Sequence, residues 1–373
     1  MKNYIQNSCI YVNLYTVAEN IRALDASVGE RCSVIPVLKG DAFGLGLLPM
    51  AKCITAAVRV PYIAVAHISE GVELREGGIN TPVLVLGGIL PEQYETAVRS
   101  NLTVSASRIG MLPRLGEFAR MQGRRIDVHI AIDTGLGRYG VHAGDELAAL
   151  LSEIKTNRDC IRVTGTYSHF ADAETLGSPR TATQYIRYCE ALEEIKKAGI
   201  DPGLCHLSNS AASEYMPGAN FGAIRVGRRL FFDNPAKPLG TVREAASWRT
   251  RVTGLRQVAA DEAFGYGSGL TLGHDGTVAL IGVGYGDGLR HDIVRAHAPV
   301  LLHGVRVPLL GMCMDTAFID ATGVPCGLGD EVTMFGYSGE GDFLSAQEVA
   351  AYAGDEGCGL TCNLLPRVKR IYE

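Results

Sequence analysis

The sequence lacks the features that mark secreted, membrane-spanning and nucleic-acid-binding proteins. Its first residues, Met1-Lys2-Asn3-Tyr4-Ile5, contain no apolar signal-peptide core, and no later stretch has the length and apolarity of a membrane span. The formal charge is −5 and the pI is about 6.0, so there is no basic excess that would favour nucleic acid as a partner. We therefore expect a cytoplasmic protein with no nucleic-acid partner.

The sequence also lacks paired cysteines. Its ten cysteines are scattered, none forms a CxxC pair, and several lie inside apolar runs. This distribution is typical of reduced, buried thiols in the cytosol and argues against a disulfide framework or a zinc site. We accordingly expect no metal.

No internal repeat and no long low-complexity linker interrupts the 373 residues, a length that suits two domains. The chain is 47% hydrophobic and 20% charged, with 45 glycines, as in a globular protein with many tight turns. Beyond about residue 237 helical periodicity nearly disappears, and short strands with turn signals take over. These strands are expected at 251–257, 278–283, 300–302, 305–310 and 331–335. We predict one domain over 1–236 and a mostly-β domain over 237–373.

The first domain alternates short apolar strands with amphipathic helices. Strands are expected at 34–39, 62–66, 82–86, 102–105, 127–132, 161–168, 205–207 and 223–226. The clearest helices are expected at 107–121, 145–156 and 182–198. Eight strands joined by crossover helices predict a (β/α)8 barrel. A doubly wound open sheet would account for six of the strands and leave two unexplained.

Lys39 lies at the end of the first expected strand. The residues before it are mostly apolar, which suits a strand buried on both faces, and glycines after it indicate a tight loop. A lysine partly desolvated at such a place has a lowered pKa, so its amine can act as a base or form a Schiff base with an aldehyde cofactor. Taken alone, a lysine there is more often one that extends its charged end to solvent.

Other polar residues follow later strands of the expected barrel. The run 133–138 (Asp-Thr-Gly-Leu-Gly-Arg) follows the fifth strand, and His169 follows the sixth. Asn209-Ser210 follows the seventh, and Arg225 with Gly227 closes the eighth. Because barrel enzymes build their active sites where strands meet the following loops, these residues predict one active-site cleft.

The last two of these loops also suggest an anion site. Asn209-Ser210 stands where a helix begins, and free N–H groups there can hold a phosphate. Gly227 lets the backbone approach a ligand closely. An ordinary helix N-cap and a turn glycine explain the same residues equally well.

Five segments, in order along nearly the whole chain, resemble the alanine racemase family. They are Val37-Leu38-Lys39-Gly40-Asp41-Ala42-Phe43-Gly44, Asp133-Thr134-Gly135-Leu136-Gly137-Arg138, Ser168-His169-Phe170-Ala171, Ser208-Asn209-Ser210-Ala211-Ala212 and Gly311-Met312-Cys313-Met314-Asp315. The resemblance implies a barrel followed by a β domain, the cofactor pyridoxal 5'-phosphate, and a head-to-tail homodimer with composite active sites.

The resemblance also implies a role for each site residue. Lys39 holds the cofactor and serves as one of two bases, and Tyr266, delivered by the partner subunit in the segment 264–268, is the other. The implied cofactor-binding residues are Lys39, Arg138, His169, Asn209, Ser210, Arg225, Gly227 and Arg228. Arg225 faces the pyridine nitrogen, and Arg138 also contacts the substrate carboxylate. Tyr285 and Met314 reach the substrate from the partner, although interface packing alone would explain both.

The sequence departs from the family at three places. Phe43 replaces a tyrosine that contacts the phosphate, and Ala131 replaces a lysine that braces Arg138. At the substrate entrance a tyrosine of some alanine racemases is missing. Either Pro366 stands at its place with Asn363 one turn away, or, after a small shift of the alignment, Asn363 itself replaces it, so Asn363 is an expected substrate-binding residue. A roomier, more polar pocket admits serine as well as alanine. This resembles the racemase portion of the membrane-bound serine/alanine racemases of vancomycin resistance, which supply D-amino acids for peptidoglycan precursors and carry a preceding membrane domain.

Two other functions compete with this one. A decarboxylase of basic amino acids shares the cofactor, the barrel lysine and a β domain, but it needs a distinct acidic and cysteine-bearing site. A non-catalytic cofactor-binding barrel of vitamin homeostasis is shorter and lacks the β domain. The run 133–138 and the segment carrying Tyr266 favour the racemase.

Overall fold

The computed structural model describes residues 6–232, 242–266 and 269–373. Two compact units divide the chain. The barrel unit consists of Ile21–Ala42 and Leu47–Leu230, and the β unit consists of Met1–Asn20, Phe43–Gly46 and Phe231–Glu373. No helix in the described ranges combines the length and apolarity that crossing a membrane requires.

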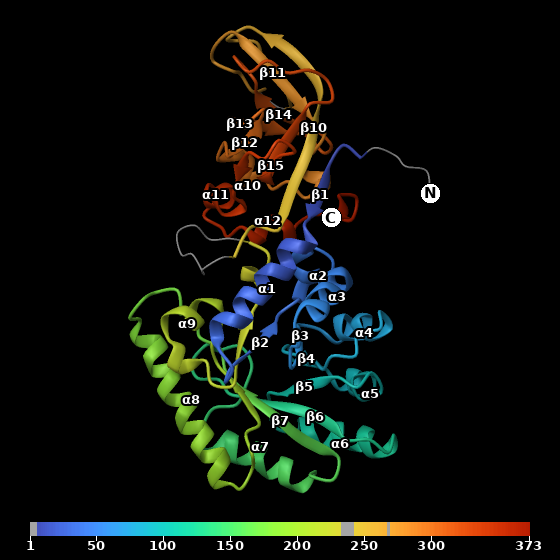
Figure 1. Cartoon of the computed structure of the whole chain (residues 1–373), viewed down its shortest axis with the longest axis vertical. Coiled ribbons are helices and arrows are strands. Elements are labelled where there is room, and N and C mark those ends of the chain that lie inside the picture. The colour runs from blue at the N-terminus through green and yellow to red at the C-terminus, as the bar shows by residue number, and fades with distance from the viewer. Residues whose placement is uncertain (1–5, 233–241, 267–268) are drawn as a thin grey trace. The chain divides into compact units, whose positions relative to one another are not determined.

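The barrel unit contains all eight predicted strands (Figure 1). They are β2 (Ser33–Pro36), β3 (Ile63–Val65), β4 (Val83–Val85), β5 (Thr103–Ala106), β6 (Ile126–Ala131), β7 (Ile161–Tyr167), β8 (Leu204–His206) and β9 (Ala223–Val226). Strands β3 to β8 pair in sequence order, and β2 pairs in parallel with β9. A bridge from Val37 to Ala64 joins β2 to β3. The amide of Gly222, directly before β9, donates to Cys205 O in β8 (3.0 Å). This bond links β8 to β9, so the strands form a barrel.

Helical segments precede the first strand of the barrel and follow the later ones (Figure 1). They are α1 (Leu14–Val28), α2 (Lys39–Gly44), α3 (Leu47–Ala57), α4 (Ile68–Glu76), α5 (Tyr94–Arg99), α6 (Met111–Met121), α7 (Asp145–Thr156), α8 (Pro179–Lys197) and α9 (Ser210–Tyr215). The three clearest predicted helices correspond to α6, α7 and α8. In α8, Tyr188, Leu192 and Ile195 are buried at helical spacing, so the apolar stripe packs toward the strands.

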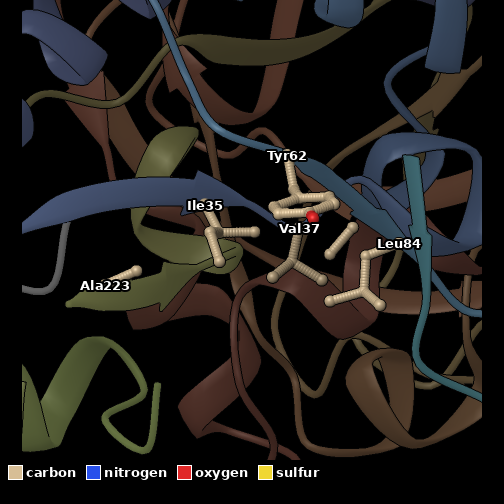
Figure 2. Packing of buried hydrophobic residues seen from close by; sticks show 6 residues of the cluster. Ile35, Val37, Tyr62, Leu84 and Ala223 are labelled. Carbon is tan, nitrogen blue, oxygen red and sulfur yellow. The ribbon is translucent and has the colours of Figure 1, made fainter. Parts of the chain in front are cut away.

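Apolar side chains fill the barrel unit between its strands (Figure 2). Ile35 of β2, Val37 directly after β2, Leu84 of β4 and Ala223 of β9 form one buried cluster with Tyr62. Parallel strands covered by helices bury both faces, which explains why the sequence shows continuous apolar runs rather than alternation. This packed interior supports the strand ends that carry the predicted site.

The β unit is built on one nine-stranded sheet with the order β16-β15-β12-β13-β14-β11-β10-β1-β17. Its strands are β1 (Cys9–Val12), β10 (Ala246–Val258), β11 (Gly276–Ile281), β12 (Pro299–Leu302), β13 (Val305–Met312), β14 (Ala317–Asp320), β15 (Glu331–Tyr337), β16 (Phe343–Leu344) and β17 (Lys369–Tyr372). Its helices are α10 (His291–Arg295), α11 (Ala346–Ala351) and α12 (Cys358–Cys362). An additional pairing of β15 with β10 closes part of the sheet into a ring. The mostly-β prediction is thereby confirmed.

Two short segments lie in a different unit from the one that the sequence suggested. Strand β1 pairs with β10 and β17, so the N-terminal residues join the β unit rather than a domain over 1–236. Phe43–Gly46 also joins the β unit, where Arg370 Nε donates to Gly44 O (2.9 Å) and Tyr372 Oη donates to Leu45 O (3.0 Å). Pairing between segments hundreds of residues apart leaves no local signal. The predicted boundary between 236 and 237 lies outside the described residues.

Candidate active site

Lys39 begins a left-handed turn instead of ending a strand. Strand β2 stops at Pro36, and Lys39 is the first residue of α2. Asp41, Ala42 and Phe43 have φ of 55°, 52° and 57°, between glycines that also have positive φ. For L-residues this conformation costs roughly 1–2 kcal/mol each, so other contacts must hold the turn. Lys39 is exposed in the single chain, so the expected desolvation of its amine is absent there.

Arg225 is the buried centre of the site. It lies in β9 opposite Ile35 of β2, four residues before Lys39, and it is only 4% exposed. Its Nη1 donates to His206 Nδ1 (2.7 Å), and its Nη2 donates to His169 Nδ1 (2.8 Å). Both terminal nitrogens also donate to backbone carbonyls, including Ser168 O at 2.6 Å. Its Nε–H has no acceptor among the described residues.

Burial lowers the pKa of Arg225 to about 10, which still leaves the guanidinium charged at neutral pH. Burial also lowers the pKa of His169 well below its ordinary value. The charges of Arg225, Arg138 and Lys39 lower that pKa of His169 further, so these groups lie within electrostatic reach of one another. Because Arg can only donate, neutral His169 accepts at Nδ1 and carries its proton on Nε2. The geometry therefore offers a protonated Nε2 to a neighbouring acceptor.

The loop after β6 is held by its own aspartate. Asp133 Oδ1 accepts from the amides of Gly135 (2.8 Å) and Leu136 (3.0 Å), and both of its carboxylate oxygens accept from Gly137. Burial raises the pKa of Asp133, but these backbone N–H groups outweigh burial and leave that pKa below its ordinary value. The turn presents Arg138, whose side chain is exposed.

The resemblance implies that position 131 holds a lysine in the family, whereas this chain has Ala131. Two arginines of α8 support the neighbouring loop. Arg180 Nη2 donates to Gly135 O (2.8 Å), and Arg187 Nη1 donates to Thr134 O (3.1 Å). Both contacts hold the backbone of the loop rather than the Arg138 side chain. Ala131 is the buried last residue of β6.

Helix α9 begins where the sequence suggested an anion site, but the side chains of Asn209 and Arg228 contact other protein groups. Asn209 is the N-cap of α9, and its Oδ1 accepts from Ala212 N (3.0 Å), which is the ordinary capping role. Ser210 is the first residue of α9, and Gly227 lies in the loop directly after β9; both are half-buried. The side chain of Arg228 forms an ion pair with Glu174 (3.0 Å).

The other predicted site residues lie in the β unit. Tyr266 is 84% exposed, Tyr285 41% and Met314 52% in the single chain. The predicted segment around Tyr266 ends in residues 267–268, which lie outside the described residues. Buried Asp287 accepts from Arg367 Nε at 2.5 Å and from the amide of Gly284 (2.9 Å), so it closes the turn that contains Tyr285.

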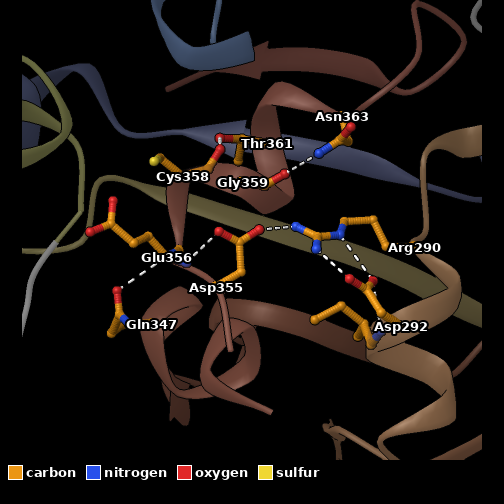
Figure 3. A network of polar contacts seen from close by, with 11 residues as sticks. Arg290, Asp292, Gln347, Asp355, Glu356, Cys358, Gly359, Thr361 and Asn363 are labelled. Atoms are coloured by element: carbon orange, nitrogen blue, oxygen red, sulfur yellow. Dashed lines mark hydrogen bonds and ion pairs between the residues drawn. The ribbon is translucent and has the colours of Figure 1, made fainter. Parts of the chain in front are cut away.

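Asn363 ends helix α12 and belongs to a polar network (Figure 3). Its Nδ2 donates to Gly359 O (2.6 Å). Arg290 bridges Asp292 and Asp355 beside this helix, and a Cβ at Gly359 would come within 2.5 Å of the Asp355 carboxylate. The helix therefore packs closely on the ion pair, which fixes the position of Asn363.

Sequence reasoning missed three buried residues that hold the site. His206 accepts from Arg225 at Nδ1, and its Nε2 contacts His129 Nδ1 at 2.9 Å. His206 and His129 thus continue the hydrogen-bonded chain that starts at Arg225. Gln184 of α8 donates to Thr134 Oγ1 (3.2 Å) and to His169 O (2.9 Å), which ties two loops together. In the sequence, Gln184 lies on the apolar stripe of α8, and a polar residue at such a position could have indicated a buried hydrogen-bonding role.

Fold and site together define a barrel enzyme with a following β domain. Lys39 follows β2, buried Arg225 lies in the neighbouring strand β9, and helix α9 follows β8. The family model for the alanine racemase N-terminal domain matches residues 12–235, and that for the C-terminal domain matches residues 245–372. The chain belongs to the alanine racemase family, whose members depend on pyridoxal 5'-phosphate.

Curated relatives and solved structures agree along the whole chain. Alanine racemase 2 of Caldanaerobacter subterraneus subsp. tengcongensis is 31% identical over 100% of this chain and 96% of its own. The alanine racemase of Symbiobacterium thermophilum is 33% identical over 97% and 96%. The alanine racemase of D-cycloserine-producing Streptomyces lavendulae has a TM-score of 0.92 at 27% identity, covering 100% of this chain and 98% of that one. The Bacillus anthracis enzyme, solved with bound L-Ala-P, has a TM-score of 0.91 at 27% identity over 99% and 96%.

Proposed function

We propose that this protein racemises alanine with pyridoxal 5'-phosphate by a two-base mechanism. The observation that carries the proposal is Arg225, which is buried and charged, spends both terminal nitrogens on protein acceptors and keeps its Nε–H for another partner. The pyridine nitrogen of the cofactor is such an acceptor. A donor that does not release its proton leaves that nitrogen largely unprotonated, which favours racemisation over transamination.

The residues of the barrel unit suit the cofactor. When bound, pyridoxal 5'-phosphate supplies an aldehyde for a lysine amine and a ring that acidifies the Cα–H of an amino acid. Lys39 would bind the aldehyde, and Arg225 would face the ring nitrogen. Ser210, the backbone of Gly227 and the neighbouring Arg228 would hold the phosphate, with Asn209 fixing the turn as N-cap. Phe43 offers no hydroxyl, so one phosphate contact of the family is missing.

Two bases must face opposite sides of the substrate Cα. Lys39 serves one face, and we assign the other to Tyr266 of a second copy of the chain. Tyrosine has an ordinary pKa near ~10 and needs an acceptor or donor that stabilises its oxygen. The Nε2–H of His169 supplies a hydrogen bond of that kind. Arg138 would hold the substrate carboxylate, a task that suits a planar guanidinium.

The exposure of Tyr266, Tyr285 and Met314 supports a homodimer in which each copy completes the site of the other. A mixture of two inactive variants tests it. In a mixed dimer of Lys39→Ala with Tyr266→Phe, one site keeps both wild-type residues and the other keeps neither. Random exchange should restore about a quarter of the wild-type activity. No restoration, with dimers shown by sedimentation, would contradict composite sites.

Chiral chromatography of L-alanine incubated with the enzyme and cofactor tests the reaction itself. We expect equal amounts of the two enantiomers at equilibrium, deuterium at Cα in D2O, and no CO2. Tyr266→Phe should impair racemisation of both enantiomers, because loss of either base interrupts the same reaction, and it should leave the absorbance of the bound cofactor intact. The control Tyr352→Phe changes another exposed tyrosine of the β unit (52% exposed) and should have no effect. Release of CO2, or unaltered racemisation by Tyr266→Phe, would refute the proposal.

Serine is a second candidate substrate. Asn363 is exposed at the C-terminus of α12, and its Nδ2 is bonded to Gly359 O, which leaves Oδ1 to accept from a β-hydroxyl. We expect kcat/KM for L-serine less than a thousandfold below that for L-alanine, a limit of about 4 kcal/mol. Asn363→Ala should impair serine turnover more than alanine turnover. A larger ratio, or equal effects on both substrates, would exclude this role.

We further propose that the D-amino acid feeds peptidoglycan precursors in the cytoplasm. All ten cysteines are free thiols, as in a reducing compartment. Expression in a bacterium that requires external D-alanine should remove the requirement, and Lys39→Ala should not. Growth that still depends on external D-alanine would contradict this role.

A further inference from the structure

Glu70 is a half-buried carboxylate that joins the loops after β2 and β3. It is the third residue of α4, whose N-cap is His67. Its Oε1 accepts from Gly40 N (2.6 Å), and its Oε2 accepts from Ala66 N (2.8 Å) and His67 N (2.9 Å). We propose that Glu70 is a positioning residue for the cofactor-binding lysine, acting through the amide of Gly40. The inference rests on the proposed role of Lys39 as the lysine that binds the cofactor.

The amide of Gly40 belongs to the peptide directly after Lys39. On the other side of the lysine, Leu38 N donates to Ala64 O (2.8 Å), and Leu38 O accepts from Ala42 N (2.9 Å). The Glu70 bond therefore supplies the fixed point on the C-terminal side of the Lys39 Cα. Without it, the exposed amide of Gly40 would bond to water, and the peptide plane would be free to rotate.

The turn needs such a fixed point because its backbone is strained. Three consecutive non-glycine residues, Asp41, Ala42 and Phe43, have positive φ. Strain of this kind persists only where surrounding contacts over-determine the conformation. Asp41 Oδ1 holds the far end of the turn by accepting from Leu47 N (2.7 Å), and Glu70 holds its start.

A simpler role for Glu70 is to cap α4. A glutamate at the third helical position commonly accepts from the N-cap amide, and glutamine does so equally well. That capping role accounts for the bonds from Ala66 and His67. It does not account for the bond from Gly40, which lies in a different loop.

Glu70→Gln separates the two roles. Its single carbonyl oxygen can keep the capping bond to His67, whereas its NH2 group would meet the Gly40 amide donor to donor. Glu76→Gln is the matched control, because Glu76 is exposed near the C-terminal end of the same helix. Both variants remove one negative charge from α4.

The measurements are cofactor affinity, the absorbance of the lysine-bound cofactor, borohydride trapping at Lys39, and thermal unfolding of the apoprotein. We expect Glu70→Gln to bind pyridoxal 5'-phosphate about tenfold or more weakly and to be trapped at Lys39 more slowly. Its apoprotein should melt as the wild type does. Glu76→Gln should match the wild type in every measurement.

Wild-type cofactor affinity and trapping in Glu70→Gln would overturn the proposal and leave Glu70 as a helix cap. If the apoprotein of Glu70→Gln is unstable, the double variant Glu70→Ala, His67→Asn restores an N-cap without the bond to Gly40. Wild-type cofactor affinity in that double variant would equally overturn the proposal. These readouts do not need turnover. A wild-type protein that binds the cofactor at Lys39 but does not racemise alanine would refute the proposed function and leave the Glu70 measurements decisive.

Discussion

Three neutral histidines buried around Arg225 make the barrel unit sensitive to acid. Burial, with a smaller contribution from the charge of Arg225, lowers the pKa of His129 to about 3. Burial likewise lowers the pKa values of His169 and His206 well below their ordinary value, again with a contribution from Arg225. The unfolded chain, in which a histidine has a pKa near ~6.5, therefore takes up protons that the folded chain cannot.

The sign and size of the effect follow from proton linkage. A depressed histidine pKa leaves stability unaffected above pH ~6.5 and reduces it as the pH falls from there toward about 3. At pH ~5 neutral His129 costs about 2 kcal/mol of unfolding free energy, and neutral His169 and His206 lower the stability in the same direction. Because domains are stable by only about 5–15 kcal/mol, this loss should be a measurable part of the stability of the barrel unit.

Urea unfolding of the apoprotein between pH 7.5 and 5 measures this effect. Far-UV circular dichroism follows the helices of the barrel unit, whereas Trp248, the one tryptophan, lies in β10 and reports on the β unit. His129→Asn keeps an acceptor for His206 near the position of Nδ1 and removes one titrating ring. It should reduce the pH dependence of the unfolding free energy. The exposed His291→Asn should not change it.

An unfolding free energy from circular dichroism that is constant between pH 7.5 and 5 would refute the reasoning. So would a pH dependence in His129→Asn equal to that of the wild type. Acidic side chains do not confuse the result, because most carboxylates titrate below this range.

Three further predictions concern the support of the site. Gly165→Ala should destabilise the protein by about 1–3 kcal/mol in urea unfolding, because its Cβ would lie 2.5 Å from the His129 ring; a neutral result would mean that the ring moves freely. Asp133→Ala should raise KM for alanine more than it lowers kcat, since three amides lose their acceptor, and an unchanged KM would contradict this. Arg225→Lys should lower the unfolding free energy or the cofactor affinity by at least about 3 kcal/mol, because one ammonium cannot donate to His169 and His206 together. Urea unfolding measures the first quantity, and titration with the cofactor measures the second.

Local pattern was enough for most of the barrel. Each buried parallel strand appears as a short apolar run, and α6, α7 and α8 follow from helical periodicity, so their positions needed no tertiary information. Strand β1 could not be assigned in this way. Four residues, Cys9–Val12, are held only by partners more than 200 residues away, in β10 and β17.

The sequence also placed Lys39, His169 and Arg225 near one another, because parallel strands bring the following loops to one end of a barrel. It wrongly made Lys39 the end of a strand. The left-handed turn depends on contacts from Glu70 and from the chain around Leu47, which no local pattern contains.

The amino-acid sequence by itself therefore determined the class of fold, the family and the chemical identity of the groups at the strand ends. Strand periodicity and residue type are local properties, and both can be read along the chain. Only the tertiary structure decided which protons those groups carry. Arg225 donates to two rings that burial keeps neutral, and donor geometry and desolvation arise only when distant residues pack together.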